Sequence, residues 1–525
     1  MDNLLSIVTF TPAIAALILA IFLRGADEMA NRNARWVALF ATLLTFLISL
    51  FVLFGFEPTE EGFQFLEDRE WMPGLQYKVG VDGISVMLVA LAAFLMPLVI
   101  GASWGVEHRV KEFMISLLLF ETFVLGALMA LDLVLFFVFL EAAIVPVFLI
   151  VGIWGGAGRQ ATGFKALVAN GLGAAVLLVA IVVMVSEAGT TDIPQLLNHV
   201  FDASDIRIAG LEVIGGLQSL LVLGLVAGFA VKLPLWPFHG WMPGIQAQAP
   251  VAGAVMLRTL MSVLAGYGVL RLAMPMFPLG AEAVAPLIYA VSGFAALFGA
   301  LAAIGQDDLR RRIAYLSIAQ MALVVMAVFA ANQQGLDGAV FLLLSHGLVV
   351  AGLLLVAGAL FDRTETTALD AFGGVSVRMP VLAAMFLLFT WGVVGIPGTG
   401  GFVALLLAIT GVFQTSPIAA LAACASLVMV AAAGLVMFRR VMLGDLIKES
   451  LKSLDDLSPR ERLTLAPLAA AILALGLYPG FVTERIGPAT GRLAANHAAD
   501  LAAAEAARAA PLQSAGLSLP GPVTR

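Results

Sequence analysis

The chain has 525 residues, of which 61% are hydrophobic and only 12% are charged, and its formal net charge is −7. This composition excludes an ordinary soluble enzyme, gives no sign of a nucleic-acid partner, and indicates an all-α protein that crosses a lipid bilayer many times. Cys424 is the single cysteine, which excludes a disulfide and a cysteine-ligated cluster. The five histidines are scattered without metal-ligand spacing, so we expect neither a metal nor a cofactor in this chain.

Apolar stretches long enough to cross a bilayer recur from one end of the sequence to the other. The first begins at Leu4 behind Asp2, so it is interpreted as a spanning helix and not as a cleavable signal, whose start would be basic. At about 20 residues per span, we predict about fourteen transmembrane helices. They are expected near residues 4–23, 34–56, 81–101, 112–131, 133–152, 164–186, 214–233, 250–272, 283–304, 312–331, 338–361, 380–410, 416–438 and 462–481.

Two of the predicted helices contain breaks. The seventh ends at Lys232, and Pro234 and Pro237 follow at once, where proline interrupts a helix. The twelfth, at 380–410, contains Gly-Ile-Pro-Gly-Thr-Gly-Gly at 395–401. A lysine at membrane depth costs about 2.5–3.5 kcal/mol, and a charge at a broken helix is typical of an ion or proton site. The alternative is a lysine whose ammonium reaches the headgroup region from a helix end.

The two breaks divide the chain into regions. Each broken helix is the fourth in a block of five, and the blocks cover residues 112–272 and 280–441. Because five is odd, successive blocks enter the membrane from opposite sides, so the repeat is predicted to be inverted. We expect a three-helix region at 1–111 before the blocks, and a last transmembrane helix with an Ala-rich tail at 442–525 after them.

Ionisable residues inside the predicted spans are the candidates for function. Glu141 interrupts an apolar run, and a pair with Lys232 across two helices would be switchable, although a purely structural ion pair fits the same residues. His346 lies mid-span and could relay protons, but a hydrogen-bonded core histidine is equally compatible. Arg258 cannot release a proton, so it is expected to act only electrostatically.

Two further residues complete the set of candidates. His239, at the end of the motif after Lys232, is a candidate for proton transfer, since histidine titrates near neutral pH. Lys165, near the start of the sixth predicted helix, is a candidate electrostatic or relay group.

The basic residues predict the orientation. If the N-terminus lies outside, the clusters at 24–35, 109–111, 159–165, 310–312 and 439–462 all lie in the cytoplasm. Because cytoplasmic loops carry an excess of Lys and Arg, we expect a multi-pass protein of the bacterial cytoplasmic (inner) membrane. Both its N-terminus and its C-terminus are then on the periplasmic side.

Several motifs, taken together, resemble those of the antiporter-like membrane subunits of respiratory complex I, and among these the NuoM type. They occur in order, and the length and predicted helix number also agree. The motifs are KLPLWPFHGWMP at 232–243, GIWGG at 152–156, FFVFLE at 136–141, SHGL at 345–348 and IPGTGGF at 396–402, with further matches at 80–85 and 306–315.

The resemblance implies a subunit that translocates protons within NADH:quinone oxidoreductase. It implies that 112–272 forms an inner half-channel containing the pair Glu141 and Lys232, and that 280–441 forms an outer half-channel. FMN, the Fe–S clusters and the quinone substrate are then expected in partner subunits, with NuoL-like and NuoN-like neighbours in the membrane. No NADH or quinone chemistry is expected in this chain.

The sequence departs from the family pattern at three positions. Val263 stands where a central lysine is usual, Leu405 where a glutamate follows the second break, and Gln320 where a histidine is common. Neither valine nor leucine can hold a proton. Three hypotheses therefore stay open: a working proton pump, a non-conducting structural paralogue, and a subunit of a related Mrp-type cation/proton antiporter or membrane-bound hydrogenase.

Overall fold

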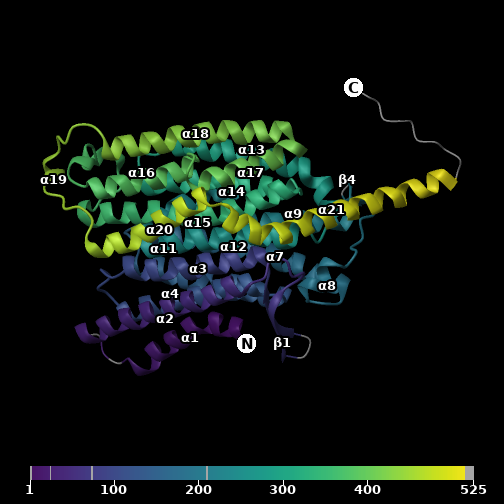
Figure 1. Ribbon diagram of the computed structural model, residues 1–525, viewed down its shortest axis with the longest axis horizontal. Coiled ribbons are helices and arrows are strands. Elements are labelled where there is room, and N and C mark those ends of the chain that lie inside the picture. Colours follow the sequence, from purple (N-terminus) through teal and green to yellow (C-terminus); the bar gives the residue numbers. More distant parts are fainter. Residues whose placement is uncertain (1–2, 24, 26, 73–74, 209–210, 515–525) are drawn as a thin grey trace.

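The computed structural model describes residues 3–23, 25, 27–72, 75–208 and 211–514. Its long helices run side by side in one bundle (Figure 1). Within the described part of the chain, 11 helices are long and apolar enough to cross a membrane, or 12 if the bent pair at the C-terminus counts as one span. The prediction of a mainly helical, multi-pass membrane protein is confirmed, whereas the number fourteen stays a prediction.

The helices of the first half are bounded as follows. They are α1 (Leu4–Phe22), α2 (Glu28–Gly55), α3 (Gly83–Ala102), α4 (Val110–Met129), α5 (Leu133–Ala142), α6 (Ile144–Trp154), α7 (Arg159–Ala188), α8 (Ile193–Leu197), α9 (Gly216–Lys232), η1 (Phe238–Trp241), α10 (Met242–Gln248), α11 (Val251–Val255), η2 (Met256–Leu260), α12 (Met261–Gly268) and η3 (Val269–Ala273). The span expected at 133–152 is confirmed as Leu133–Trp154. It is interrupted locally at Ala143, between α5 and α6, because Pro146 has no N–H for the carbonyl of Ala142.

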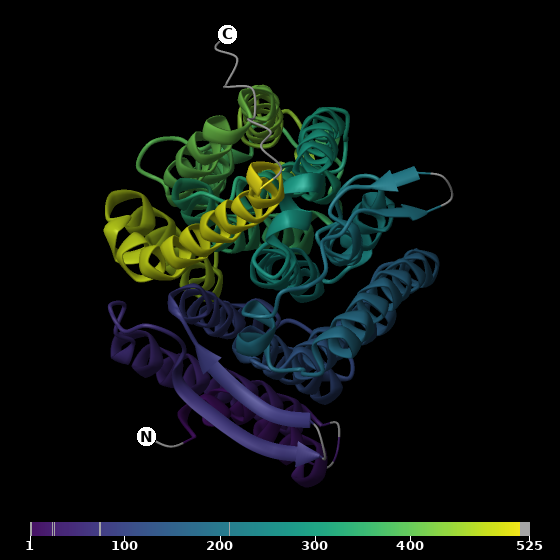
Figure 2. The same cartoon turned by 90° about the vertical axis from the view of Figure 1, so that its right-hand side faces the viewer.

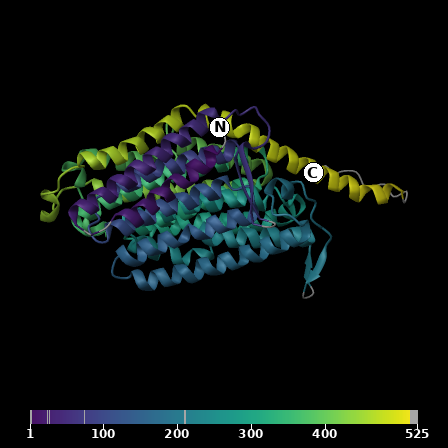
Figure 3. The same ribbon diagram turned by 90° about the horizontal axis from the view of Figure 1, so that it is seen from below.

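The second half continues in the same way. Its helices are α13 (Pro278–Ile304), α14 (Leu309–Phe329), α15 (Gln333–Thr364), η4 (Leu369–Ala371), η5 (Val375–Val377), α16 (Pro380–Val394), α17 (Gly400–Thr415), α18 (Pro417–Met442), α19 (Glu449–Lys452), α20 (Pro459–Leu477) and α21 (Gly480–Ser514). The most apolar 18-residue stretches of the span Val251–Ala273 and of helix α15 are fully buried, so they form the centre of the bundle. Helix α21 bends by 68° from α20. It leaves the bundle at the end where the short hairpin of strands β3 (Ile206–Ile208) and β4 (Leu211–Val213) also projects (Figure 3).

Both predicted breaks are confirmed. Helix α9 ends at Lys232, and a turn precedes η1. Helix α16 ends at Val394 and α17 begins at Gly400. Gly395 and Gly398 have φ of +79° and +91°, a backbone conformation that glycine adopts without steric cost. The helices on either side of these breaks are short, which is why α9, α16 and α17 fall below the length of a full span.

Two antiparallel hairpins were not predicted. Strands β1 (Gln64–Met72) and β2 (Leu75–Val81) form the first, and β3 (Ile206–Ile208) and β4 (Leu211–Val213) the second. Figure 2 shows the first hairpin lying across the N-terminal helices. The Glu67 carboxylate on β1 accepts hydrogen bonds from the backbone N–H groups of Leu5 at 2.8 Å and Ser6 at 3.1 Å. It therefore satisfies free donors at the start of α1.

One capping motif occurs twice in the chain. Asp132 accepts from the backbone N–H of Leu135 and the hydroxyl of Thr191 at the start of α5. Asp308 makes the same two contacts, with the N–H of Arg311 and the hydroxyl of Thr367, at the start of α14. The first motif leads into α8 and the second into η4, beside the loop that carries α19, and Figure 1 shows α8 and α19 at opposite ends of the bundle. The two capping motifs thus lie at opposite ends of the bundle, and the inverted repeat stays a prediction.

Candidate functional site

The predicted pair is formed at the break after α9. The Lys232 Nζ lies 3.0 Å from Oε1 of Glu141 and 3.1 Å from Oε2, and it donates to the latter. The Lys232 side chain is fully enclosed, and that of Glu141 is 22% exposed. The prediction that these two groups lie together is therefore confirmed. Helix α9 ends with its cation at the C-terminus, which is the favourable end for a positive charge.

The backbone around the break is held by hydrogen bonds that replace those lost to proline. Leu235 donates its N–H to the carbonyl of Ala230 at 2.8 Å. The indole Nε1 of Trp241 donates to the carbonyl of Val231 at 3.1 Å. These bonds fix the last turn of α9, so the lysine is presented from a defined backbone position. The motif 232–243 thus supplies the charge, the break and the side chain that stabilises the break.

A second polar group occupies the centre of the bundle. The Arg258 guanidinium, on the π-helical turn η2, donates to the hydroxyls of Ser317 and, at 3.2 Å, of Ser262. The His346 Nε2 lies 3.0 Å from the Ser317 hydroxyl and 3.3 Å from the carbonyl of Arg258. All four residues are at most 2% exposed. Arg258 therefore lies within hydrogen-bond reach of the histidine network, which the sequence alone did not establish.

The same network reaches the second helix break. The His346 Nδ1 lies 3.0 Å from Oε1 of Gln320, whose amide Nε2 donates to the carbonyl of Val393 at 3.3 Å. Val393 is in the last turn of α16, directly before the break. Glutamine at position 320 thus joins α14, α15 and α16 with neutral hydrogen bonds. A proton could enter this chain of groups only at His346.

The duplicated capping motif relates the two polar groups. Glu141 follows Asp132 by nine residues, and Ser317 follows Asp308 by nine. Ser317 therefore has the same offset from its capping aspartate as Glu141. Ser317 has an uncharged hydroxyl, and the Arg258 guanidinium donates to it.

His239 and Lys165, the other two predicted positions, have different surroundings. His239 is half-buried, with its ring against Phe298 at 4.9 Å between centroids and Tyr315 at 6.2 Å. Lys165 lies exposed on α7. Their predicted roles stay predictions.

The two apolar substitutions are enclosed in the bundle. Val263 is 1% exposed and Leu405 is 3% exposed. Leu405 packs against the second break, since a β-carbon added to Gly395 would lie 2.7 Å from its Cδ1. Apolar walls of this kind disfavour ordered water.

Sequence reasoning missed one residue with the character of a site. Glu121 on α4 is 1% exposed, and neither of its carboxylate oxygens has a hydrogen-bond partner among the described residues. It is the one acidic residue in the apolar run 113–129, so the same pattern that indicated Glu141 could have indicated it.

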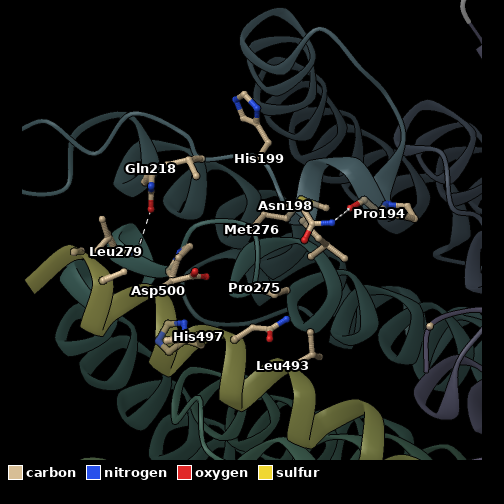
Figure 4. Close-up of a pocket in the computed structure, with 18 of the residues that line it drawn as sticks. Pro194, Asn198, His199, Gln218, Pro275, Met276, Leu279, Leu493, His497 and Asp500 are labelled. Atoms are coloured by element: carbon tan, nitrogen blue, oxygen red, sulfur yellow. Dashed lines mark hydrogen bonds between the residues drawn. The ribbon is translucent and has the colours of Figure 1, made fainter. Parts of the chain in front are cut away.

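A cavity of about 700 Å³ opens near the rim, between α21 and the segment around α8 (Figure 4). His497 and Asp500 of α21 line one side, and Asn198 and His199 the other. None of the predicted site residues lines it. In the described part of the chain, no group of three His, Cys, Asp or Glu side chains is arranged to hold a metal ion.

The bundle with two broken helices and a buried pair at one of them defines a membrane protein of the antiporter-like class. A family model described as "NADH:quinone oxidoreductase/Mrp antiporter, TM" matches residues 130–431. A second, described as "NADH-ubiquinone oxidoreductase chain 4, amino terminus", matches residues 14–131. The chain belongs to the family of NADH-quinone oxidoreductase subunit M, which includes chain 4 of the NADH-ubiquinone oxidoreductases.

Individual relatives agree with this assignment. NADH-quinone oxidoreductase subunit M of Rhodobacter capsulatus is 48% identical over 95% of this chain and 98% of its own length. NADH-ubiquinone oxidoreductase chain 4 of Marchantia polymorpha is 35% identical over 86% of this chain and 90% of its own. A chain in the structure of respiratory complex I from Thermus thermophilus aligns with a TM-score of 0.84 at 25% identity, covering 94% of this chain and 99% of that one. A chain of the Mrp complex from Dietzia aligns at 0.79 and 21% identity, covering 94% and 97%, which shows a shared fold.

Proposed function

We propose that this chain, as a membrane-arm subunit of NADH-quinone oxidoreductase, takes part in proton translocation coupled to quinone reduction. The observation that carries the proposal is the Glu141–Lys232 pair, with an enclosed ammonium at the end of a broken helix. Two opposite charges at this depth are stable together, and each is costly alone. The Mrp-type antiporter and hydrogenase alternative is less well supported, because the subunit M relative is far more similar than the Mrp chain.

The chemistry of the pair is a switch between two arrangements. While Nζ of Lys232 contacts the Glu141 carboxylate, both charges are stabilised. If the carboxylate moves away, the ammonium loses its counter-charge in a low-dielectric site, so the neutral amine becomes favourable and a proton leaves. Return of the carboxylate favours uptake of a proton. Residues 112–272 would then act as the inner half-channel.

The outward half of the route rests on His346. Its two ring nitrogens face Ser317 on one side and Gln320 on the other, so the ring bridges two hydrogen-bonded groups. A neutral imidazole can accept a proton at one nitrogen and release one from the other. Arg258 beside it stays charged and acts only electrostatically. Residues 280–441 would then act as the outer half-channel. Nearer the surface, His239 would transfer protons and Lys165 would act as an electrostatic or relay group.

Electron transfer is assigned to partner subunits. One cysteine cannot ligate an Fe–S cluster, so the clusters are assigned to other chains of the complex, and FMN and the quinone site are proposed to lie there too. NuoL-like and NuoN-like subunits are the proposed membrane neighbours. The proposed location is the bacterial cytoplasmic membrane with both termini periplasmic, which is supported by the distribution of Lys and Arg.

A Glu141→Gln variant tests the proposal. Glutamine keeps the shape of the side chain but cannot supply the negative charge that holds the lysine. We expect purified complex in liposomes to translocate fewer protons per electron pair, by this subunit's share. The control is Glu187→Gln, an acidic residue at the end of α7, which should leave the ratio unchanged. An unchanged ratio in Glu141→Gln would contradict the proposal.

A second candidate function is a structural subunit that does not conduct. The observation that favours it is the burial of valine and leucine at 263 and 405. In that case the Glu141–Lys232 pair would only stabilise the fold, and removing it would lower stability without changing proton translocation.

A further inference from the structure

We propose that Arg258 gates the outward half of the route. While its guanidinium is bonded to Ser317, it holds the His346 ring neutral and in one tautomer, and His346 takes up a proton only after the guanidinium has left Ser317. The inference deepens the proposed function and rests on it for the use of His346 as a relay. The state of the ring in this structure rests on its hydrogen bonds alone.

The hydrogen bonds around His346 run in one direction. The carbonyl of Val393 can only accept, and the amide Nε2 of Gln320 donates to it at 3.3 Å. The Oε1 of Gln320 therefore faces the His346 Nδ1 at 3.0 Å, and because this oxygen only accepts, Nδ1 carries the hydrogen. On the other side of the ring, the Arg258 Nε donates to the Ser317 hydroxyl oxygen. The hydroxyl hydrogen then points to Nε2 at 3.0 Å, so a neutral ring with its hydrogen on Nδ1 satisfies the whole chain.

Neither end of this chain of hydrogen bonds can exchange a proton. The guanidinium of Arg258 does not release one, and neither the amide of Gln320 nor the backbone carbonyl behind it takes one up. The basic atom in the chain is Nε2 of His346, and it is already accepting from the Ser317 hydroxyl while the guanidinium is in place. The arrangement in this structure is therefore closed to protons.

The charge of Arg258 also makes protonation of His346 costly. A proton on Nε2 would place an imidazolium and a guanidinium on the same serine oxygen. A like charge nearby disfavours the charged form of a titratable group. Arg258, Ser317 and His346 are at most 1% exposed, so water does little to screen the two charges from each other.

Within the described part of the chain, no acidic side chain lies near enough to offset this repulsion. Helices α3, α11, α12, α16 and α17, which pack against α15, carry neither acidic nor basic residues. On α15 itself, Asp337 is nine residues from His346, about 13 Å along the helix. Its carboxylate is bonded to Thr490 and Gln333. The other acidic residues on elements packed against α14 or α15 lie close to helix ends, or at the rim cavity in the case of Asp500; they are Glu282, Asp362, Glu461, Glu484 and Asp500.

The contacts of Arg258 offer its guanidinium a second position. Nη1 already donates to the Ser262 hydroxyl at 3.2 Å, and Nη2 has no hydrogen-bond partner among the described residues. Arg258 lies in the π-helical turn η2, an irregularity of a kind that is frequent at functional sites. A shift toward Ser262 leaves the Ser317 hydroxyl free to rotate, so that its oxygen accepts from Nε2–H once His346 has gained a proton. The ring later gives up a proton to water and is neutral again.

Passive proton flux through the resting complex tests the gate. Purified complex would be reconstituted in liposomes, a potassium diffusion potential would be applied without NADH, and proton entry would be followed with an internal pH dye. We expect Arg258→Gln, which removes the charge, to admit protons several-fold faster than the unmodified complex. Arg258→Lys keeps a cation and should admit them at a rate between the two. The control is Thr259→Val, which removes a buried hydroxyl bonded to the carbonyl of Val255 and should leave the rate unchanged.

A second substitution separates a gate from a defect in packing. Arg258→Gln combined with His346→Gln has no titratable ring, so proton entry should return to the rate of the unmodified complex. Entry that stays fast in this double variant, or that does not rise in Arg258→Gln, would overturn the proposal. If Arg258→Gln does not assemble, Arg258→Met is measured with the same expectations, since an apolar side chain there leaves no acidic partner unpaired.

The proposed function is judged by a different measurement. Passive proton entry needs no turnover, whereas this subunit's share of pumped protons is measured with Lys232→Ala during NADH oxidation. A full ratio of protons to electrons in Lys232→Ala, together with fast entry in Arg258→Gln, would refute the pumping role and leave the gate standing. A lowered ratio in Lys232→Ala, together with unchanged entry in Arg258→Gln, would refute the gate and leave the pumping role standing.

Discussion

Asp82 and Arg271 show how this chain satisfies a buried charge that has a structural role. The Arg271 Nη2 lies 2.6 Å from Oδ2 of Asp82, and the guanidinium also lies over the ring of Phe63 at 5.3 Å. Asp82 in turn caps α3 by accepting from the N–H of Ser85 at 2.9 Å. Each charge has several partners. Among the residues that the structure describes, Glu141 is the one ion-pair partner of Lys232, and a charge with so few partners is easier to separate.

Arg271→Leu should destabilise the folded protein strongly. It leaves the Asp82 carboxylate buried without its cation, which typically costs about 3–5 kcal/mol. Thermal unfolding of the purified complex in detergent would measure the loss. The double variant Asp82→Leu with Arg271→Leu removes both charges and should lose less. An Arg271→Leu protein as stable as the unmodified one would contradict this interpretation.

The same pair predicts a pH dependence of stability. Burial alone would raise the pKa of Asp82, but the Arg271 guanidinium lowers it below its ordinary value of 3.8. A lowered folded-state pKa means that the stabilisation is fully present above pH 3.8 and is lost as the pH falls through the lowered value. Unfolding temperature measured against pH should therefore fall at acid pH, and less so in the double variant. If the unfolding temperature falls equally in the unmodified protein and in the double variant, the pH dependence does not come from the Asp82–Arg271 pair.

The helix breaks were predictable because they depend on local chemistry. Proline after Lys232 removes backbone donors and ends the helix, and glycine at 395 and 398 permits a positive φ. Both effects can be recognised in the sequence without knowledge of the fold. The pairing of Glu141 with Lys232 was also predictable from the sequence, because a buried charge is costly unless a charge of opposite sign lies beside it.

Other features depend on contacts between distant segments and could not be read in advance. The hairpin β1–β2 is short and charged, and its role of capping α1 through Glu67 appears only when 62 residues of chain are folded back. The contact of Arg258 with Ser317 depends on how α14 packs against η2. The local interruption between α5 and α6 was signalled by Pro146, but the length of the apolar stretch indicated one span.

Gly395→Ala should destabilise the second break. Its φ of +79° disfavours any side chain, and the new β-carbon would lie 2.7 Å from Leu405. We expect a loss of about 1–3 kcal/mol in thermal unfolding. Gly163→Ala is the matched control, because that glycine is helical with nothing within 4 Å of the added carbon, and alanine there should be neutral or stabilising. Equal effects at both glycines would show that the break does not require the left-handed conformation.

Restoring the usual charges at 263 and 405 tests whether the route beyond Lys232 is dry. We expect Val263→Lys with Leu405→Glu to raise proton translocation per electron pair in reconstituted complex. Either change alone should do less, because one new charge would stay buried and unpaired. If the unmodified complex already pumps at full stoichiometry, and the double variant adds nothing, protons pass through His346 or another path without those residues.

The distribution of Lys and Arg predicts how the whole bundle is oriented in the membrane. The predicted topology places Glu61, in the loop before β1, on the periplasmic side and Glu449, at the start of α19, in the cytoplasm. Since Cys424 is the single cysteine, a Cys424→Ala protein offers a clean background for single cysteines at these exposed positions. We expect a membrane-impermeant thiol reagent to label Glu61→Cys in whole cells and Glu449→Cys only after lysis. The reverse pattern would show that the chain is oriented the other way.

The proton-to-electron ratio of complex carrying Lys232→Ala is the most direct test of the Glu141–Lys232 pair as a proton-transfer site. Purified complex would be reconstituted in liposomes, and proton uptake would be measured against NADH oxidation beside Lys165→Ala, which removes an exposed lysine of α7. We predict that Lys232→Ala lowers the ratio by this subunit's share and that Lys165→Ala lowers it less. A Lys232→Ala complex that assembles, oxidises NADH and keeps the full ratio would contradict the account and leave this chain a structural subunit.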